Sequence, residues 1–277
     1  MVKRIPQRLL QGLGHIVIRM FRRVVLELGE LVLLQWNILK AAARVGTRWR
    51  ILRRFYLRPI IEQMVVTGVR SIPVVLTTAL FTGMVLAVQT GVTLEAKIQG
   101  TSAFIGNIVN LALVRELGPV LTAILVTGRV GSAMAAEIGT MEITEQIDAL
   151  RTLAANPVEH LAMPRFVAVV CMLPVLTVLA DVMGSLGGWL VASLHLGISS
   201  NVYWSGAVDT VQFTDIASGI SKSFFFAAIL VVFALHRGFK THGGAEGVGR
   251  ATTGSVVSAS ITILIADYFL TQLYAMF

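Results

Sequence analysis

The chain has 277 residues, of which 55% are hydrophobic and 14% are charged, and its mean hydropathy is +0.78. Soluble globular domains carry about 25% charged residues, so this composition argues against an ordinary soluble domain and indicates an integral membrane protein. The net charge of +8 is concentrated in residues 1–59, where thirteen Lys or Arg stand against two acids, a bias that favours anchoring at the cytoplasmic side of a membrane over nucleic-acid binding.

This basic N-terminal segment contains an amphipathic stretch at residues 16–40. At about 100° per residue, the charged side chains gather on one side of a helix, and Phe21, Val25 and Leu28 lie on the other. The longest charge-free piece, residues 31–39, is shorter than the roughly 20 apolar residues that a membrane span needs. We therefore expect residues 1–59 to form a cytoplasmic segment whose helix lies in the membrane interface.

Five longer apolar stretches follow, and no polar linker divides them. They are predicted at about residues 62–89, 104–136, 165–194, 213–235 and 252–275. Residues 60–277 are thus expected to form a single all-α membrane domain.

The distribution of basic residues predicts the orientation of these spans. The loops at 137–164 and 236–251 hold Arg151, Arg237, Lys240 and Arg250, whereas the loops at 90–103 and 195–212 hold only Lys97. Because basic loops stay in the cytoplasm, the N-terminus is expected inside and the C-terminus outside.

A short amphipathic helix is predicted at about residues 141–153, between the second and third spans. Ile143, Ile147 and Leu150 fall on one side of it, and Thr144 is a candidate N-cap. Such a cytoplasmic helix is either a docking element for a soluble partner or a simple connector, and its pattern alone leaves both interpretations open.

Several charges interrupt the apolar stretches, and such residues are functional candidates. Arg115 and Glu116 are adjacent, so they project about 100° apart and do not satisfy one another. At about 1.5 Å per residue from the outer helix ends, Arg115, Lys222 and Asp267 lie at similar depths of ~17, ~14 and ~12 Å, and Asp181 lies deeper at ~20 Å. We expect Glu116 to interact with Lys222, and Arg115 to reach Asp267 or an anionic ligand.

Two long segments resemble the MlaE family of ABC transporter permeases, the membrane subunits of Mce-type lipid transport systems. They are LVRELGPVLTAILVTGRVGSAMAAEIGTMEITEQIDALRTLAANPVEHLAMPRF, from Leu113 to Phe166, and GAEGVGRATTGSVVSAS, from Gly244 to Ser260. With the five-span layout, the resemblance covers most of the chain. The N-terminal 50 residues match less distinctively.

The resemblance implies a homodimeric permease in the bacterial inner membrane. Two cytoplasmic ABC ATPases would drive it, and a hexameric ring of MCE domains would sit on the periplasmic side, often with a small STAS-domain protein on the ATPase. The implied cargo is a phospholipid or similar hydrophobic lipid, moved between the inner membrane and a periplasmic route to the outer membrane. The resemblance thus links the chain to the lipid asymmetry of the outer membrane. This chain has no G-x-x-x-x-G-K-[ST] loop, so ATP and Mg are expected on the partner and no cofactor on this chain.

The resemblance also implies roles for individual residues. The helix at 141–153 resembles the family's coupling helix, which seats in a groove of the ATPase; the implied contacts are Glu142, Glu145, Gln146, Ile147, Asp148, Leu150 and Arg151. Arg115, Glu116, Lys222 and Asp267 are expected near a lipid cavity, where they either contact the lipid phosphate or form a structural network. Leu76, Leu80 and Met84, at i, i+4 and i+8, are candidates for lining that cavity, although such a stripe more often packs helix against helix.

No catalytic or metal site is predicted, and the chain is not expected to be an enzyme. The five histidines form no H-E-x-x-H motif. An alternative function is an ion-coupled secondary transporter that uses the buried charges as a relay, although no inverted repeat is visible. A structural scaffold for the MCE ring is a third, weaker alternative.

Overall fold

The computed structural model describes residues 7–47, 55–95 and 104–276, and within these ranges the chain is helical and contains no strand. Five helical stretches are long and apolar enough to cross a membrane: Leu57–Thr93, Ile105–Ile143, Val158–Leu194, Phe213–Phe239 and Gly244–Ala275. The predicted all-α membrane fold is therefore confirmed. Lys97 and the side chain of Phe21 lie outside the described residues.

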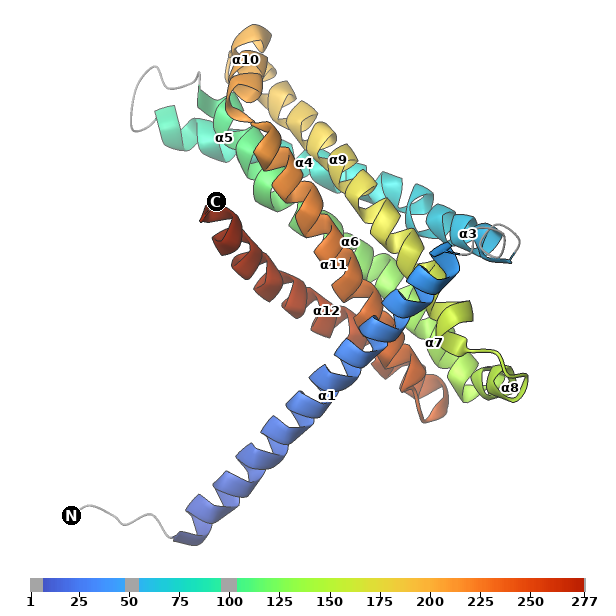
Figure 1. Cartoon of the computed structure of the whole chain (residues 1–277). Coiled ribbons are helices and arrows are strands. Elements are labelled where there is room, and N and C mark those ends of the chain that lie inside the picture. Colours follow the sequence, from blue (N-terminus) through green and yellow to red (C-terminus); the bar gives the residue numbers. More distant parts are fainter. Residues whose placement is uncertain (1–6, 48–54, 96–103, 277) are drawn as a thin grey trace, which may run out of the picture.

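The N-terminal helix α1 (Gln7–Thr47) is longer than the predicted 16–40 and projects away from the other helices (Figure 1). Its acids face the protein: Glu27 lies 3.0 Å from Arg237, and Glu30 pairs with Lys240. Apolar side chains such as Leu33, which is 62% exposed, point outward. An outward apolar face suits a helix that lies against lipid.

The first two spans are interrupted rather than continuous. The first consists of α3 (Leu57–Thr67), the short turn η2 (Val69–Ser71) and α4 (Ile72–Glu95). The second runs through α5 (Ile105–Ala112), η4 (Leu113–Leu117), α6 (Gly118–Val126), η5 (Thr127–Gly131) and α7 (Ser132–Ile143). Both η4 and η5 are π-helical turns, which hold one residue more than an α turn and often occur at functional sites.

The remaining spans are the π turn η6 (Val158–Ala162) with α9 (Met163–Leu194), α11 (Phe213–Phe239) and α12 (Gly244–Ala275). The predicted outer loop at 195–212 contains a further helix, α10 (Ser200–Thr210), which begins at an N-cap serine, Ser199. Tyr203 of α10 is buried and donates a hydrogen bond to the Ser185 carbonyl oxygen at 3.2 Å. This outer segment is thus packed onto the bundle.

Helices α4 and α9 cross in close contact because glycines meet at their interface. A methyl group on Gly83 would overlap the backbone carbonyl of Gly184. Small residues let helix backbones approach closely in a membrane, where no hydrophobic effect drives helices together. The main apolar core forms around this pair and α11, with Leu173, Phe226 and Leu230 fully buried.

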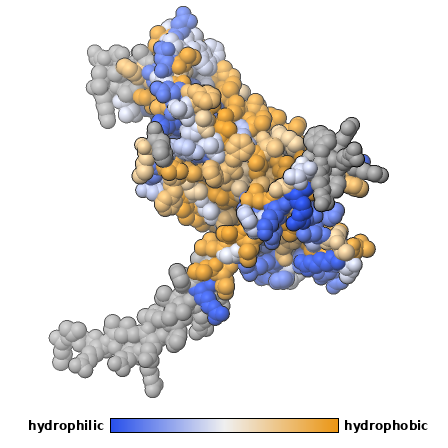
Figure 2. Space-filling view, in the orientation of Figure 1, coloured by the Kyte–Doolittle hydropathy of each residue, from blue (hydrophilic) through white to orange (hydrophobic). Residues whose placement is uncertain are grey.

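Polarity divides the surface along the length of the bundle. Apolar side chains cover the middle of the visible face and hydrophilic ones gather at its two ends (Figure 2). Helix α10 lies at one end, and the short helix α8 (Gln146–Thr152) lies at the other, together with the turn between α11 and α12 (Figure 1). The bundle therefore has an α10 end, an apolar middle and an α8 end.

Candidate functional site: a charge cluster among the membrane helices

A lysine in the apolar run of α11 is at the centre of the site. Lys222 is 1% exposed, and its Nζ lies 2.6 Å from Glu116 Oε2 and 3.0 Å from Asp267 Oδ1. It also donates to Thr271 Oγ1 at 2.8 Å and to the Arg115 carbonyl oxygen at 3.1 Å. These five residues, which we call the Lys222 cluster, join the second, fourth and fifth spans. A charge that is taken out of water needs such partners, because isolated burial costs several kcal/mol.

The local sequence explains how the second span presents its part of the cluster. Arg115 and Glu116 lie in the π turn η4, and Pro119 is the second residue after this turn. Proline has no N–H to donate to the carbonyl four residues earlier, which is that of Arg115. Lys222 donates to this same carbonyl oxygen. The proline and the extra residue of the turn therefore bring a backbone acceptor and the Glu116 carboxylate to one ammonium group.

Arg115 has a different partner from the one expected. Its Nε lies 3.6 Å from Asp215 Oδ1 in the first turn of α11, whereas Asp267 is taken by Lys222. The other oxygen of Asp215 accepts a hydrogen bond from the Gln212 backbone N–H at 2.9 Å and caps α11. The Arg115 side chain remains 39% exposed. The expected contact between Arg115 and Asp267 is thus wrong, whereas contact of Arg115 with a lipid phosphate stays a prediction.

Asp181 lies apart from the Lys222 cluster, in a pocket of about 410 Å³ towards the α10 end. Its Oδ1 is buried and has no hydrogen-bond partner among the described residues. The α6 backbone approaches closely here, since a methyl group on Gly118 would overlap this oxygen. Asn110, Ser185 and Trp204 also line the pocket.

The residues expected to line a lipid cavity lie on a partly buried side of α4. Leu76, Leu80 and Met84 are half-buried, and the backbone of Leu80 lies against Gly187 of α9. Met84 packs on the second apolar cluster, which includes Ala87 and Ile105. A hollow of about 540 Å³ lies instead on the adjacent face of α4, lined by Thr77, Thr78, Phe81, Thr82, Val85, Leu86 and, from the second span, Leu117.

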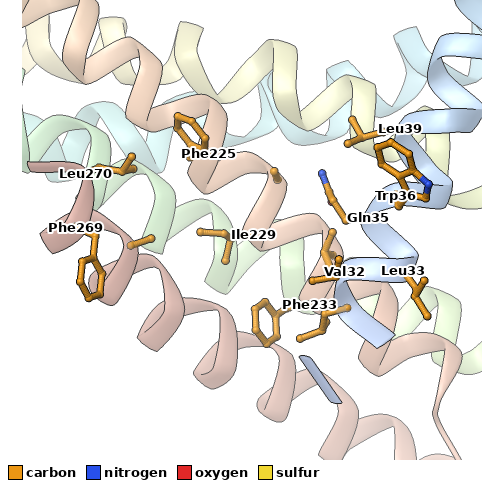
Figure 3. A pocket seen from close by; sticks show the side chains of 14 residues that line it. Val32, Leu33, Gln35, Trp36, Leu39, Phe225, Ile229, Phe233, Phe269 and Leu270 are labelled. Carbon is orange, nitrogen blue, oxygen red and sulfur yellow. The ribbon is translucent and has the colours of Figure 1, made fainter. Parts of the chain in front are cut away.

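A larger apolar groove of about 700 Å³ lies between α1, α11 and α12. Trp36 and Leu39 of α1 face Phe225 and Ile229 of α11 across it, and Gln35 points into it (Figure 3). Its walls are almost entirely apolar, so it suits hydrocarbon chains rather than polar ligands.

The predicted coupling helix is shorter than expected. Helix α7 continues to Ile143, and the chain then reverses through Glu145, whose φ of 58° is left-handed, before α8 begins at Gln146. Thr144 is therefore not the N-cap of α8; it follows the end of α7.

The residues implied to contact an ATPase divide into two groups. Ile147 is fully buried, so it anchors α8 to the bundle, and Glu142 and Leu150 are half-buried. The exposed members are Glu145, Gln146, Asp148 and Arg151, and Asp148 accepts a hydrogen bond from Arg151 at 2.6 Å. Leu153, which is not among the residues predicted to contact an ATPase, is 78% exposed directly after α8.

Among the described residues, no three His, Cys, Asp or Glu side chains form a group that holds a metal ion. The candidate site consists of charged side chains and apolar surfaces. It combines a buried, internally paired cluster with open apolar hollows, an arrangement that suits an amphipathic molecule better than a small polar one.

Comparisons with known proteins agree with this chemistry. A family model described as "Permease MlaE" matches residues 60–273, which include almost all of the five spans. The "Intermembrane phospholipid transport system permease protein MlaE" of Haemophilus influenzae is 41% identical over 215 residues, covering 77% of this chain and 82% of the relative.

Two further relatives come from other groups of organisms. A "Probable ABC transporter permease protein" of Rickettsia typhi is 41% identical over 223 residues, covering 79% of this chain and 83% of the relative. The chloroplastic protein TRIGALACTOSYLDIACYLGLYCEROL 1 of Arabidopsis thaliana is 39% identical over 226 residues, covering 81% of this chain and 64% of the relative.

Proposed function

Because this chain belongs to the MlaE permease family, we propose that it is the membrane subunit of an ABC transporter that moves phospholipid or a similar hydrophobic lipid. The observation that carries the proposal is the match over residues 60–273 together with 41% identity to a phospholipid transport permease. The chain is a multi-pass membrane protein and a transport subunit rather than an enzyme.

The charge distribution of the site supports an amphipathic cargo. The Lys222 cluster holds its charges in place through the ion pairs that Lys222 makes with Glu116 and Asp267. Arg115 is bound more loosely and retains exposed donors, and a guanidinium suits bidentate contact with a phosphate. In this proposal the cluster is mainly structural and Arg115 is its contact with the lipid phosphate.

The remaining parts of the proposed assembly follow from the family. Two copies of this chain form the permease, with the α8 end in the cytoplasm and the α10 end in the periplasm of an inner membrane. A separate ATPase binds ATP and Mg and docks on the exposed side of α8, around Asp148. An MCE-domain ring at the α10 end, often with a STAS-domain protein on the ATPase, completes the route towards the outer membrane.

The test is reconstitution. The chain is co-expressed with a candidate ABC ATPase from the same organism, purified as a complex and placed in liposomes that contain fluorescent phospholipid. We expect co-purification, lipid-stimulated ATP hydrolysis and ATP-dependent movement of the lipid. Lipid movement by this chain alone under an ion gradient would refute the proposal and favour an ion-coupled transporter.

A further inference from the structure

The cations of the five spans can be sorted by whether a carboxylate neutralises them. Three of them, Arg115, Lys222 and Arg165, pair with carboxylates of neighbouring helices. Arg58, Arg237 and Arg250 pair with carboxylates at the surface. Among the described residues, Arg70 and Arg129 are the basic residues of the spans that have no carboxylate at ion-pair distance. Arg129 is also half-buried. An arginine in this setting requires an anion or water, because its charge is costly in the membrane.

Within the described part of the chain, the Arg129 side chain makes one hydrogen bond, and its partner is neutral. It lies in the π turn η5, and its Nη1 donates to Ser71 Oγ at 2.7 Å. Ser71 is buried and donates in turn to the Thr67 carbonyl oxygen at 2.5 Å, so its hydroxyl proton is committed and its oxygen faces the arginine. A guanidinium has about five N–H donors, and this contact uses only one of them.

The position of Arg129 along the second span matches a headgroup level. Twenty-four residues separate it from Ile105, the first residue of that span, which corresponds to a distance of about 36 Å at 1.5 Å per residue. The hydrocarbon core is about 30 Å thick, so Arg129 lies near its far boundary, on the side of α8. Arg70, in the break η2 beside Ser71, lies at the same level and is exposed.

An apolar path leads from this level into the bundle between α4 and α6. A narrow cleft is lined by Val75, one turn after Ser71, and by Leu125, one turn before Arg129. The cleft shares Thr78, Thr82 and Leu117 with the open hollow of about 540 Å³. Arg129 and Ser71 thus each lie one helical turn from an apolar cleft that adjoins the open hollow.

We propose that Arg129, positioned by Ser71, binds the phosphate of a phospholipid whose acyl chains lie in the open hollow of about 540 Å³ on α4. This second lipid site is at the α8 end. It is separate from the Lys222 cluster, which lies about 20 Å away along the second span, towards the α10 end. The inference rests on the proposed function for the identity of the ligand. The phosphate supplies the missing negative charge, and Arg70 adds a second cation at the rim.

The test measures occupancy of the site rather than transport. A photoreactive benzoylphenylalanine replaces Thr78 in the hollow, and the purified full chain in maltoside detergent is irradiated with radiolabelled phosphatidylglycerol. We expect saturable cross-linking, and an apparent affinity about tenfold weaker in Arg129→Gln, the scale of one charge-assisted contact. The control Arg250→Gln removes an exposed arginine that pairs with Glu246 and should change nothing.

Three results would overturn the inference. The first is equal cross-linking of diacylglycerol, which lacks the phosphate. The second is displacement of the lipid by inorganic phosphate at the concentration at which the lipid itself binds, which would show a site for free anions. The third is a cross-link from the Thr78 position to a second copy of the chain in place of lipid. If Arg129→Gln does not fold, Arg129→Lys is measured in its place. It keeps the charge, loses bidentate geometry and should bind more weakly than wild type.

Failure of this inference is distinguishable from failure of the proposed function. A chain that transports lipid with its ATPase but shows no Arg129-dependent cross-link refutes the site alone. A chain that cross-links as expected but supports no ATP-dependent transport refutes the transport proposal and leaves the binding site standing.

Discussion

The Nζ atom of Lys222 lies 2.6 Å from Glu116 Oε2, and this contact connects the fourth span to the π turn of the second. The lysine side chain is almost completely buried, whereas Glu116 is 37% exposed. The two partners therefore depend on the contact unequally. The carboxylate retains access to the surface of the bundle, and the ammonium has only its protein partners.

This asymmetry predicts the effect of removing the ammonium. Lys222→Met leaves the carboxylates of Glu116 and Asp267 close together without a cation, and should lower the free energy of unfolding by about 3–5 kcal/mol. Denaturant unfolding in detergent micelles measures this loss of stability. The matched control is Lys240→Met, because Lys240 pairs with Glu30 at the surface and an exposed pair contributes at most about 1 kcal/mol. Equal losses in both variants would contradict the buried pairing.

A charge swap tests the geometry of the cluster further. Exchanging the charges with Glu116→Lys and Lys222→Glu places the new carboxylate beside Asp267, 3.0 Å from the present ammonium. We expect the swap to recover stability only when Asp267→Asn is added. Full recovery by the two-residue swap would show that Asp267 is not part of the cluster.

The contact between Arg115 and Asp215 is long and partly exposed, so it should contribute little to stability. We expect Asp215→Asn to change the free energy of unfolding by no more than about 1 kcal/mol and to leave lipid-stimulated ATP hydrolysis intact. Arg115→Gln should be equally stable but weaken lipid stimulation about tenfold, because the phosphate loses a charge-assisted donor. Equal loss of stimulation in both variants would assign the role to the pair instead.

The loop after the short helix α8 offers a clean test of ATPase docking. Leu153→Glu alters a side chain that is 78% exposed, so it should weaken ATPase binding about tenfold without changing the unfolding transition. The contrasting variant is Ile147→Ala, at a fully buried position, which should cost about 2–5 kcal/mol of stability. Pull-down of the ATPase at fixed concentration provides the readout, and unchanged binding by Leu153→Glu would exclude this surface.

The crossing of α4 and α9 predicts a glycine that does not tolerate alanine. Gly83→Ala places a methyl group on the Gly184 carbonyl and forces the helices apart, so the melting temperature in detergent should fall markedly. Gly249→Ala is the control, because open space surrounds that position and alanine favours a helix over glycine by about 1 kcal/mol. A tolerated Gly83→Ala would mean that the crossing is looser than described.

The attachment of α1 to α11 should depend on pH. The Lys240 ammonium donates a hydrogen bond to Glu30 and holds the pKa of that carboxyl below its usual 4.5. A lowered carboxyl pKa stabilises the attached state at pH values above 4.5, and the contribution is lost as the pH falls through the lowered value. The ion pair of Glu27 with Arg237 supports the same contact.

Distance measurements can follow this detachment. Spin labels on Gly29→Cys, which has open space around it, and on the exposed native Cys171 report the position of α1 relative to α9. We expect a constant distance from pH 7 to 4.5 and a longer one at lower pH. In Lys240→Met the change should begin at higher pH, and an unshifted midpoint would assign the detachment to another group.

The depth of the Lys222 cluster could be predicted from the sequence, because helix rise is uniform and opposite charges at one level pair. The partner of Arg115 could not. The π turn at Leu113–Leu117 changes the direction in which the side chain projects, and a count at 100° per residue contains no such turn. Asp215 lies near the predicted start of the fourth span, and nothing in its sequence position indicates a partner in the second span.

The short helix shows the same limit at the backbone level. Ile147 was placed on an apolar side correctly, since hydrophobic periodicity is local, and it is buried. The left-handed φ of 58° at Glu145 ended α7 and delayed the start of α8. Glutamate gives no sequence signal for that conformation, which tertiary packing imposes.

The π turns of the second span have an evolutionary consequence. Arg115, Glu116 and Arg129 all lie in such turns, each of which carries one surplus residue. A single-codon deletion at either turn would restore a regular helix and rotate every later side chain of that span by about 100°. A homologue with a one-residue gap inside this span would then have these charges directed at different neighbours. Deletion variants would likewise redirect the charges without changing any residue type.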